Sequence, residues 1–128
     1  MNMDFELPPD EKAKPVMILH DVALWDAFHA MGLGFAAYLI HPSNGTCVWI
    51  VGVGQNGRAE FFVEPEVIQE LQSYSLVEVE LKRSPKGIEE GYKLTEGGQR
   101  LYVNFKDMPY DQGAGEFVDW VHKQRRPS

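Results

Sequence analysis

The clearest alternation of apolar and polar positions lies between Val67 and Asn104. The first part of this stretch has the period of an amphipathic helix, because Val67, Ile68 and Leu71 share one helical face. Pro65 suits the first turn of such a helix, where its missing N–H would have no helical partner anyway. The opposite face is polar and carries Glu66 and Glu70. The pattern therefore predicts a short helix that begins near Pro65.

A hairpin and a second helix are predicted to follow. From Leu76 the apolar and charged side chains alternate with the period of a strand, as Val77, Glu78, Val79, Glu80 and Leu81. A charged loop around Ser84-Pro85-Lys86-Gly87 then leads to a return strand at Gly91–Leu94. Thr95 is a favourable N-cap for the next helix, and Glu96 suits its first turn.

Three extended runs precede this unit, at residues 35–41, 46–54 and 59–64. The turn segments Pro42-Ser43-Asn44-Gly45 and Gln55-Asn56-Gly57-Arg58 separate them. Asn-Gly between β-prone runs is a strong hairpin signal, so we expect a three-stranded antiparallel meander. A tight turn centred on Asn56-Gly57 would place Gly52 opposite Phe61 and Val51 opposite Phe62.

Helices are expected near both ends of the chain. Asp21 is a candidate cap for a helix over residues 22–31, and residues 116–124 form an amphipathic pattern after a loop at 107–115. Residues 1–15 are acidic and contain prolines, which predicts a flexible arm. The expected fold is α+β: a single domain over residues 16–128, with the meander, a helix-hairpin-helix unit at 65–104 and a C-terminal helix.

The helix-hairpin-helix unit resembles the second half of a winged-helix domain, which occurs in many bacterial transcription regulators. The matching residues are Leu71, the phrase Ser75-Leu76-Val77-Glu78 and the run Tyr92–Leu101. By this resemblance they would form the end of a recognition helix, the two strands of the wing and the helix that follows. Two features depart from the family. The matching helix carries Glu66 and Glu70 without Lys or Arg, and an extended hairpin stands where the family has a preceding helix.

The overall charge argues against nucleic acid as the main target. The 128 residues carry 12 basic and 19 acidic side chains, a formal net charge of −7. Phosphate contacts dominate nucleic-acid affinity, and carboxylates are repelled by phosphates. The nucleic-acid alternative therefore depends on a local basic wing formed by Lys82, Arg83, Lys86 and Lys93.

Signals for catalysis or cofactor binding are weak. Gly52-Val53-Gly54-Gln55-Asn56-Gly57 has the letters of a dinucleotide fingerprint but is followed by a strand-like run instead of a helix. His20, Asp21, Asp26, His29 and His41 have no recognisable metal-ligand spacing. Cys47 near His29 or His41 would be needed for thiol chemistry, yet it lies in an apolar strand. We expect no cofactor, no metal and no membrane association, and a single cysteine suits a cytoplasmic protein.

Two surfaces are candidates for binding a protein. One is acidic and comprises Glu64, Glu66, Glu70, Glu78 and Glu80. The other is aromatic, with Phe117 and Trp120 on the last helix, where they would anchor a partner or a second copy of the chain in a homodimer. The sequence thus favours a non-enzymatic regulatory or adaptor protein that binds a protein partner. The alternatives are a DNA-binding regulator and, more distantly, a small metal- or thiol-dependent enzyme.

Overall fold

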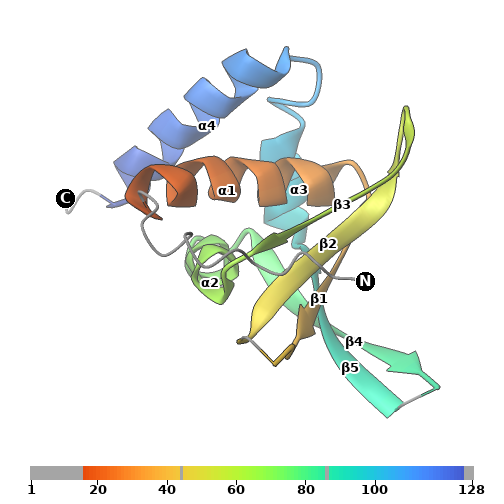
Figure 1. Ribbon diagram of the computed structural model, residues 1–128. Helices are drawn as coiled ribbons and strands as arrows, with labels where there is room; N and C mark the ends of the chain where they lie inside the picture. Colours follow the sequence, from red (N-terminus) through yellow and green to blue (C-terminus); the bar gives the residue numbers. More distant parts are fainter. Residues whose placement is uncertain (1–15, 44, 86, 126–128) are drawn as a thin grey trace.

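The computed structural model describes residues 16–43, 45–85 and 87–125 (Figure 1). Residues 1–15, expected to form an arm, lie outside the described residues. Within the described ranges, four helices and five strands follow one another in the order α1 (Val16–Gly32), β1 (Ala36–Ile40), β2 (Cys47–Gly54), β3 (Gly57–Val63), α2 (Pro65–Ser73), β4 (Val77–Ser84), β5 (Gly87–Leu94), α3 (Glu96–Tyr102) and α4 (Tyr110–Arg125). The expected α+β class is confirmed.

All five strands belong to one antiparallel sheet with the order β3-β2-β1-β5-β4. The first three strands and the later hairpin were expected as separate units. They are joined by a short pairing between β1 and β5, in which Ala37 faces Tyr92 and Tyr38 faces Gly91. This contact spans more than fifty residues of sequence, so no local turn signal could reveal it.

The register of β2 and β3 differs from the expected one by two residues. Gly52 faces Ala59 and Val51 faces Glu60, where Phe61 and Phe62 were expected. The tight turn consists of Gln55 and Asn56, and Gly54 pairs with Gly57. Gly57 has φ of 105°, a conformation that favours glycine, and it completes the turn. A slip of two keeps every side chain on its expected face, because the side-chain period of a strand is two.

The expected charged loop between β4 and β5 is in fact strand. Pairing continues as far as Ser84 and Gly87, which face each other at the end of the hairpin. Oppositely charged residues face each other along this extension, as Lys82 does with Glu89. Such cross-strand pairs stabilise the two-stranded ribbon. The run of charged residues had led to the prediction of a loop here.

Both terminal helices are longer than expected. The first begins at Val16, so Asp21 lies within α1 and is not its N-cap. The last begins at Tyr110, and the expected loop from 107 to 115 therefore ends inside α4. Gly113 lies in this added part, where a Cβ would come within 2.9 Å of the Trp25 ring. Gly113, which contributed to the prediction of a loop, is thus a position where α4 packs closely against α1.

The hydrophobic core lies on one face of the sheet. Trp25 and Phe28 of α1 are fully buried, and the Phe28 ring stacks on Phe117 of α4 at 4.5 Å between centroids. The buried side chains of the sheet all point toward the helices, and they are Ala37, Val48, Ile50, Val63, Val77, Tyr92 and Leu94. The helices therefore cover one face of the sheet, with α1 at the centre of the packing.

The start of α3 is held against the end of α2. Thr95 caps α3 as expected, because its hydroxyl oxygen accepts a hydrogen bond from the Gly98 amide at 2.9 Å. The same hydroxyl donates to the Ser75 carbonyl at 2.6 Å. Gly98 lies so close to the Leu76 backbone that an added Cβ would collide with the carbonyl oxygen. Glycine at this position is therefore a requirement of packing.

Adjacent glycines in α3 allow a matched test of this contact. We expect Gly98→Ala to lower the free energy of unfolding by about 2 kcal/mol, because strain must move the Leu76 backbone. Gly97→Ala should leave stability unchanged or raise it by up to about 1 kcal/mol, since the added methyl meets no atom closer than 3.7 Å. Urea unfolding measures both variants. Equal effects of the two substitutions would contradict the proposed contact.

Candidate functional site

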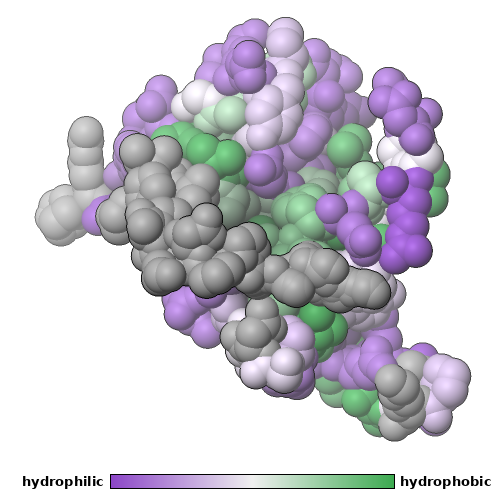
Figure 2. Space-filling view, in the orientation of Figure 1, coloured by the Kyte–Doolittle hydropathy of each residue, from purple (hydrophilic) through white to green (hydrophobic). Residues whose placement is uncertain are grey.

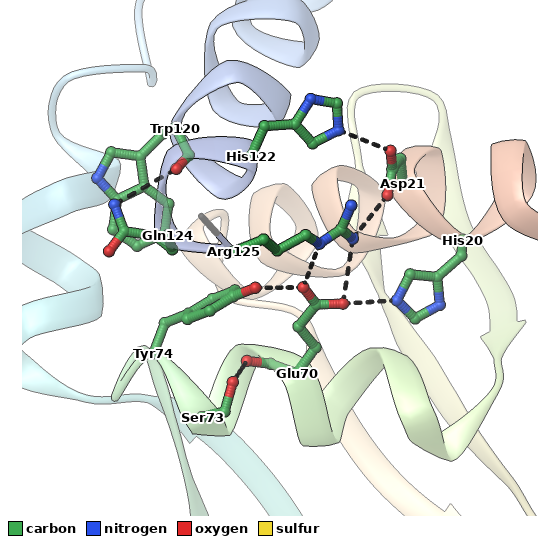
Figure 3. Close-up of polar contacts among 9 residues, drawn as sticks. All are labelled: His20, Asp21, Glu70, Ser73, Tyr74, Trp120, His122, Gln124 and Arg125. Carbon is green, nitrogen blue, oxygen red and sulfur yellow. Dashed lines mark hydrogen bonds and ion pairs between the residues drawn. The ribbon is translucent and has the colours of Figure 1, made fainter. Parts of the chain in front are cut away.

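A polar cluster joins the three helices α1, α2 and α4 (Figure 3). At its centre, the Arg125 guanidinium donates to Glu70 through Nε at 2.8 Å and through Nη2 at 3.2 Å. His20 Nε2 lies 2.8 Å from Glu70 Oε1, and the Tyr74 hydroxyl also donates to this carboxylate. Three side chains therefore converge, through four hydrogen bonds, on one carboxylate whose exposed fraction is only 18%.

Asp21 extends the cluster along α1. Arg125 Nη2 donates to Asp21 Oδ1 at 2.8 Å, and His122 Nε2 lies 3.1 Å from Asp21 Oδ2. Burial raises the pKa of Asp21, but the hydrogen bonds from Arg125 and His122 outweigh it and the net pKa is lowered. Arg125 thus bridges one carboxylate from α1 and one from α2.

The chemistry of this cluster is structural. Burial alone would raise the pKa of Glu70, but hydrogen bonds from Arg125, Tyr74 and His20 lower it to about 2. A carboxylate that remains ionised and fully hydrogen-bonded is a poor proton acceptor. Within the described ranges there is no group of three His, Cys, Asp or Glu side chains able to hold a metal ion. The cluster fixes α4 against α1 and α2.

The cluster predicts a specific pH dependence. Because the folded pKa of Glu70 is about 2 and its ordinary value 4.5, its contribution to stability is complete above about pH 4.5 and disappears as the pH falls toward 2. We expect Glu70→Gln to lower the free energy of unfolding by about 2 kcal/mol at neutral pH, after allowance for solvent screening. The difference from the unmodified chain should fall by about half near pH 3.

Chemical unfolding across this pH range measures the effect. Glu66→Gln is a matched control on the same helix, because the Glu66 side chain is exposed and α2 buries its opposite face. A pH-independent difference between Glu70→Gln and the unmodified chain would show that the ion pair is not its source.

The carboxylates expected to form one acidic surface do not gather. Glu70 is engaged with Arg125 inside the helical cluster, while Glu66 is exposed on α2. Glu78 and Glu80 lie on the sheet face away from the helices, where they pair with lysines. Glu64 precedes α2 and is exposed. The helix and the sheet therefore present these groups in different directions, and the expected common surface is absent.

Phe117 and Trp120, the aromatic anchors expected on α4, differ in how far they are accessible to a partner. Phe117 is 0% exposed and stacks between Phe28 and Trp120. Trp120 is half-buried and packs edge-on against Tyr74 at 5.7 Å. Phe117 therefore attaches α4 to the protein's own core and is closed to a partner, whereas partner binding by Trp120 stays a prediction.

The residues considered for catalysis are divided: His20, Asp26 and Cys47 line one pocket of about 350 Å³, while His29 and His41 lie outside it. His29 stacks on Trp25 at 4.8 Å and lies 2.9 Å from the Tyr102 hydroxyl, and burial lowers its pKa despite the opposing charge of Asp26. Burial and the Glu64 carboxylate raise the pKa of Cys47, which keeps the thiol protonated and weakly nucleophilic. His41 contacts Thr46 at 3.0 Å.

The basic wing residues are largely neutralised. Lys82 lies 3.7 Å from Glu80, and Lys93 lies 4.0 Å from Glu78. Arg83 is exposed near the end of β4, and Lys86 lies outside the described residues. Over the whole hairpin, residues 77–94 contain four cations and four carboxylates, so its formal charge is zero. The wing therefore offers phosphates no net attraction.

The end of the hairpin carries exposed apolar side chains on one face. Exposure rises along β4 as it leaves the body of the protein, from 4% at Val77 through 46% at Val79 to 67% at Leu81. Ile88 on β5, which faces Arg83, is 65% exposed. Figure 2 shows hydrophobic residues interleaved with hydrophilic ones on this projecting hairpin, at the lower right.

The sheet face away from the helices carries a row of three aromatic rings. Tyr38, Trp49 and Phe62 lie directly opposite one another on β1, β2 and β3. The Tyr38 and Trp49 rings are 5.8 Å apart and form the floor of a shallow groove of about 570 Å³. Sequence reasoning missed this row. Its signal is the strand alternation, which places the three rings on one face once the strands pair.

No family model, curated protein or solved structure matches the chain significantly. Among the residues that the structure describes, no helix combines the length and apolar character needed to cross a bilayer.

Proposed function

We propose that this chain is a non-enzymatic regulatory or adaptor protein that binds a protein partner through the apolar side of its β4–β5 hairpin. The observation that carries the proposal is the exposure of Val79, Leu81 and Ile88 on one face of a projecting ribbon. The resemblance of residues 67–104 to a winged-helix unit supports a role for this hairpin in recognition. It does not support a role in reading DNA sequence.

The hairpin lacks the support that a sheet normally gives a strand. Its contact with β1 ends at Gly91, and among the described residues the segment from Leu81 to Glu90 pairs only within the hairpin. An isolated two-stranded ribbon is at best marginally stable in water. Leucine and isoleucine exposed at its end add apolar area that a partner would bury. These features favour a hairpin that becomes more stable when a partner covers its apolar side chains.

Charge favours a protein over nucleic acid as the partner. The formal net charge of the hairpin is zero. Lys82 lies near Glu80 of the same strand, and Lys93 of β5 lies near Glu78 of β4. A nucleic acid would meet as many carboxylates as cations, without the counterion release that drives such binding. A protein surface with a small apolar depression has no such requirement.

Paired substitutions at the end of the hairpin test the proposal. Leu81→Asp combined with Ile88→Asp should reduce the captured partner at least tenfold, because two charges would replace the apolar contact. Both side chains are more than 60% exposed, so thermal unfolding should change little. The measurement is quantitative mass spectrometry of proteins retained by the tagged chain from its own host, followed by calorimetry with the purified partner.

Leu33→Asp is the matched control, since Leu33 is an exposed leucine after α1, with 59% exposure, outside the hairpin. It should retain the same partner as the unmodified chain. The proposal is wrong if the double variant retains it equally well. Salt-sensitive binding to duplex DNA that Lys82→Glu with Arg83→Glu abolishes would support the DNA-binding alternative instead.

A further inference from the structure

Strand β4 forms one edge of the sheet, and among the described residues its outer side pairs with no other strand. Its eight residues pair with β5 one by one from Val77 to Ser84, without a bulge. Alternate residues of an edge strand direct their N–H and C=O groups away from the sheet, where a further strand can bind them. Many proteins block such an edge with a bulge or a proline. Residues 77–84 contain neither, so β4 can pair with an added strand.

The helix-facing side of β4 offers apolar neighbours to an added strand. Val79 and Leu81 occupy alternate positions there and are 46% and 67% exposed. Side chains of a neighbouring strand lie about 5 Å from the residues opposite them, which is contact distance for branched aliphatic groups. The other edge strand, β3, has only Gly57 and Ala59 on this side of its exposed half. The apolar gain from strand addition is therefore larger at β4 than at β3.

The opposite side of the hairpin has an excess of carboxylates. Glu78 and Glu80 of β4 and Glu89 of β5 share this side with Lys82 and Lys93. Lys82 lies 3.7 Å from Glu80 and Lys93 lies 4.0 Å from Glu78, and these four side chains are each about one-third to one-half exposed. A carboxylate has room for several hydrogen bonds, so each pair can accept a further cation without breaking. The chain as a whole carries −7, which also attracts a basic segment.

We propose that the protein partner adds an extended segment to the outer edge of β4, antiparallel to it, in which apolar residues alternate with basic ones. This inference rests on the proposed function and specifies how the partner is held. The apolar residues of the segment lie beside Val79 and Leu81, and its basic residues lie beside Glu78 and Glu80. In this mode of recognition the main-chain hydrogen bonds supply affinity, and the alternate side chains supply specificity.

A synthetic peptide with this pattern is the probe. The acetylated and amidated peptide Glu-Thr-Ile-Lys-Val-Lys-Thr, paired antiparallel to β4, places its Ile and Val beside Leu81 and Val79 and its lysines beside Glu80 and Glu78. Fluorescence anisotropy with the full chain should show saturable binding. The peptide Glu-Thr-Lys-Lys-Ile-Val-Thr has the same composition without alternation in any register, and it should bind at least about tenfold more weakly.

N-methylation of the peptide tests whether it binds as a strand. One peptide carries N-methyl groups on Ile and Val, and the other carries them on the two lysines. Only alternate residues of a strand donate their N–H groups to one neighbour. One methylated peptide should therefore lose at least about tenfold in affinity, while the other binds nearly as well as the parent.

Substitutions in the chain test the position of the strand. Leu81→Asp should weaken peptide binding at least about tenfold, and so should Glu78→Lys combined with Glu80→Lys. Binding to this double variant should return when the two lysines of the peptide are replaced by glutamates, a result that an unfolded variant could not give. Ala59→Asp is the matched control, because Ala59 is exposed on the other edge strand. It should leave binding unchanged.

Three results would overturn strand addition at β4: no saturable binding, equal affinities of the two methylated peptides, or binding that the charge exchange does not alter. A dimer that Leu81→Asp dissociates would also overturn it and would assign the edge to a second copy of the chain. The proposed function fails separately. If capture of the host partner depends on Leu81 and Ile88 while the peptide tests are negative, the hairpin binds its partner by another geometry.

Discussion

Burial on only one face of the sheet is the constraint on which the rest of this structure depends. The rings of Trp25, Phe28 and Phe117 draw α1 and α4 together, and the same core receives the inward side chains of the sheet. Among the described residues, all four helices lie on this one side of the sheet, and none covers the other face. The partly exposed aromatic row on the other face follows from this one-sided arrangement.

The ion-pair cluster complements the core at one end of the helical layer. Arg125 lies near the C-terminus of α4, where the helix dipole favours a cation, and it reaches carboxylates from two other helices. Partly buried carboxylates need such partners, because desolvation without pairing is costly. The charged side chains of this cluster therefore pair with one another between the helices and are not available to bind a ligand. For this reason we place the proposed recognition on the exposed apolar side chains of the β4–β5 hairpin.

Local patterns predicted much of the fold and little of the site. The helix at residues 65–73, the Thr95 cap and the alternation of Val77, Val79 and Leu81 follow from short-range periodicity. The starts of α1 and α4 were wrong, since Asp21 and Gly113 were interpreted by local propensity while their contacts are with residues far along the chain. Glu70 was misplaced for the same reason: its partner Arg125 is 55 residues away.

The β4–β5 hairpin carries the proposed partner surface because its strands have two faces of different chemistry. Alternation gives its two faces different chemistry, with Leu81 and Ile88 on one face and Lys82 and Glu80 on the other. The apolar face is the one that the proposed protein partner would bury, because Leu81 and Ile88 are largely exposed there. The other face already has its own ion pairs, since Lys82 lies near Glu80 and Lys93 lies near Glu78. The hairpin can therefore bind a partner through one face without breaking the ion pairs on the other.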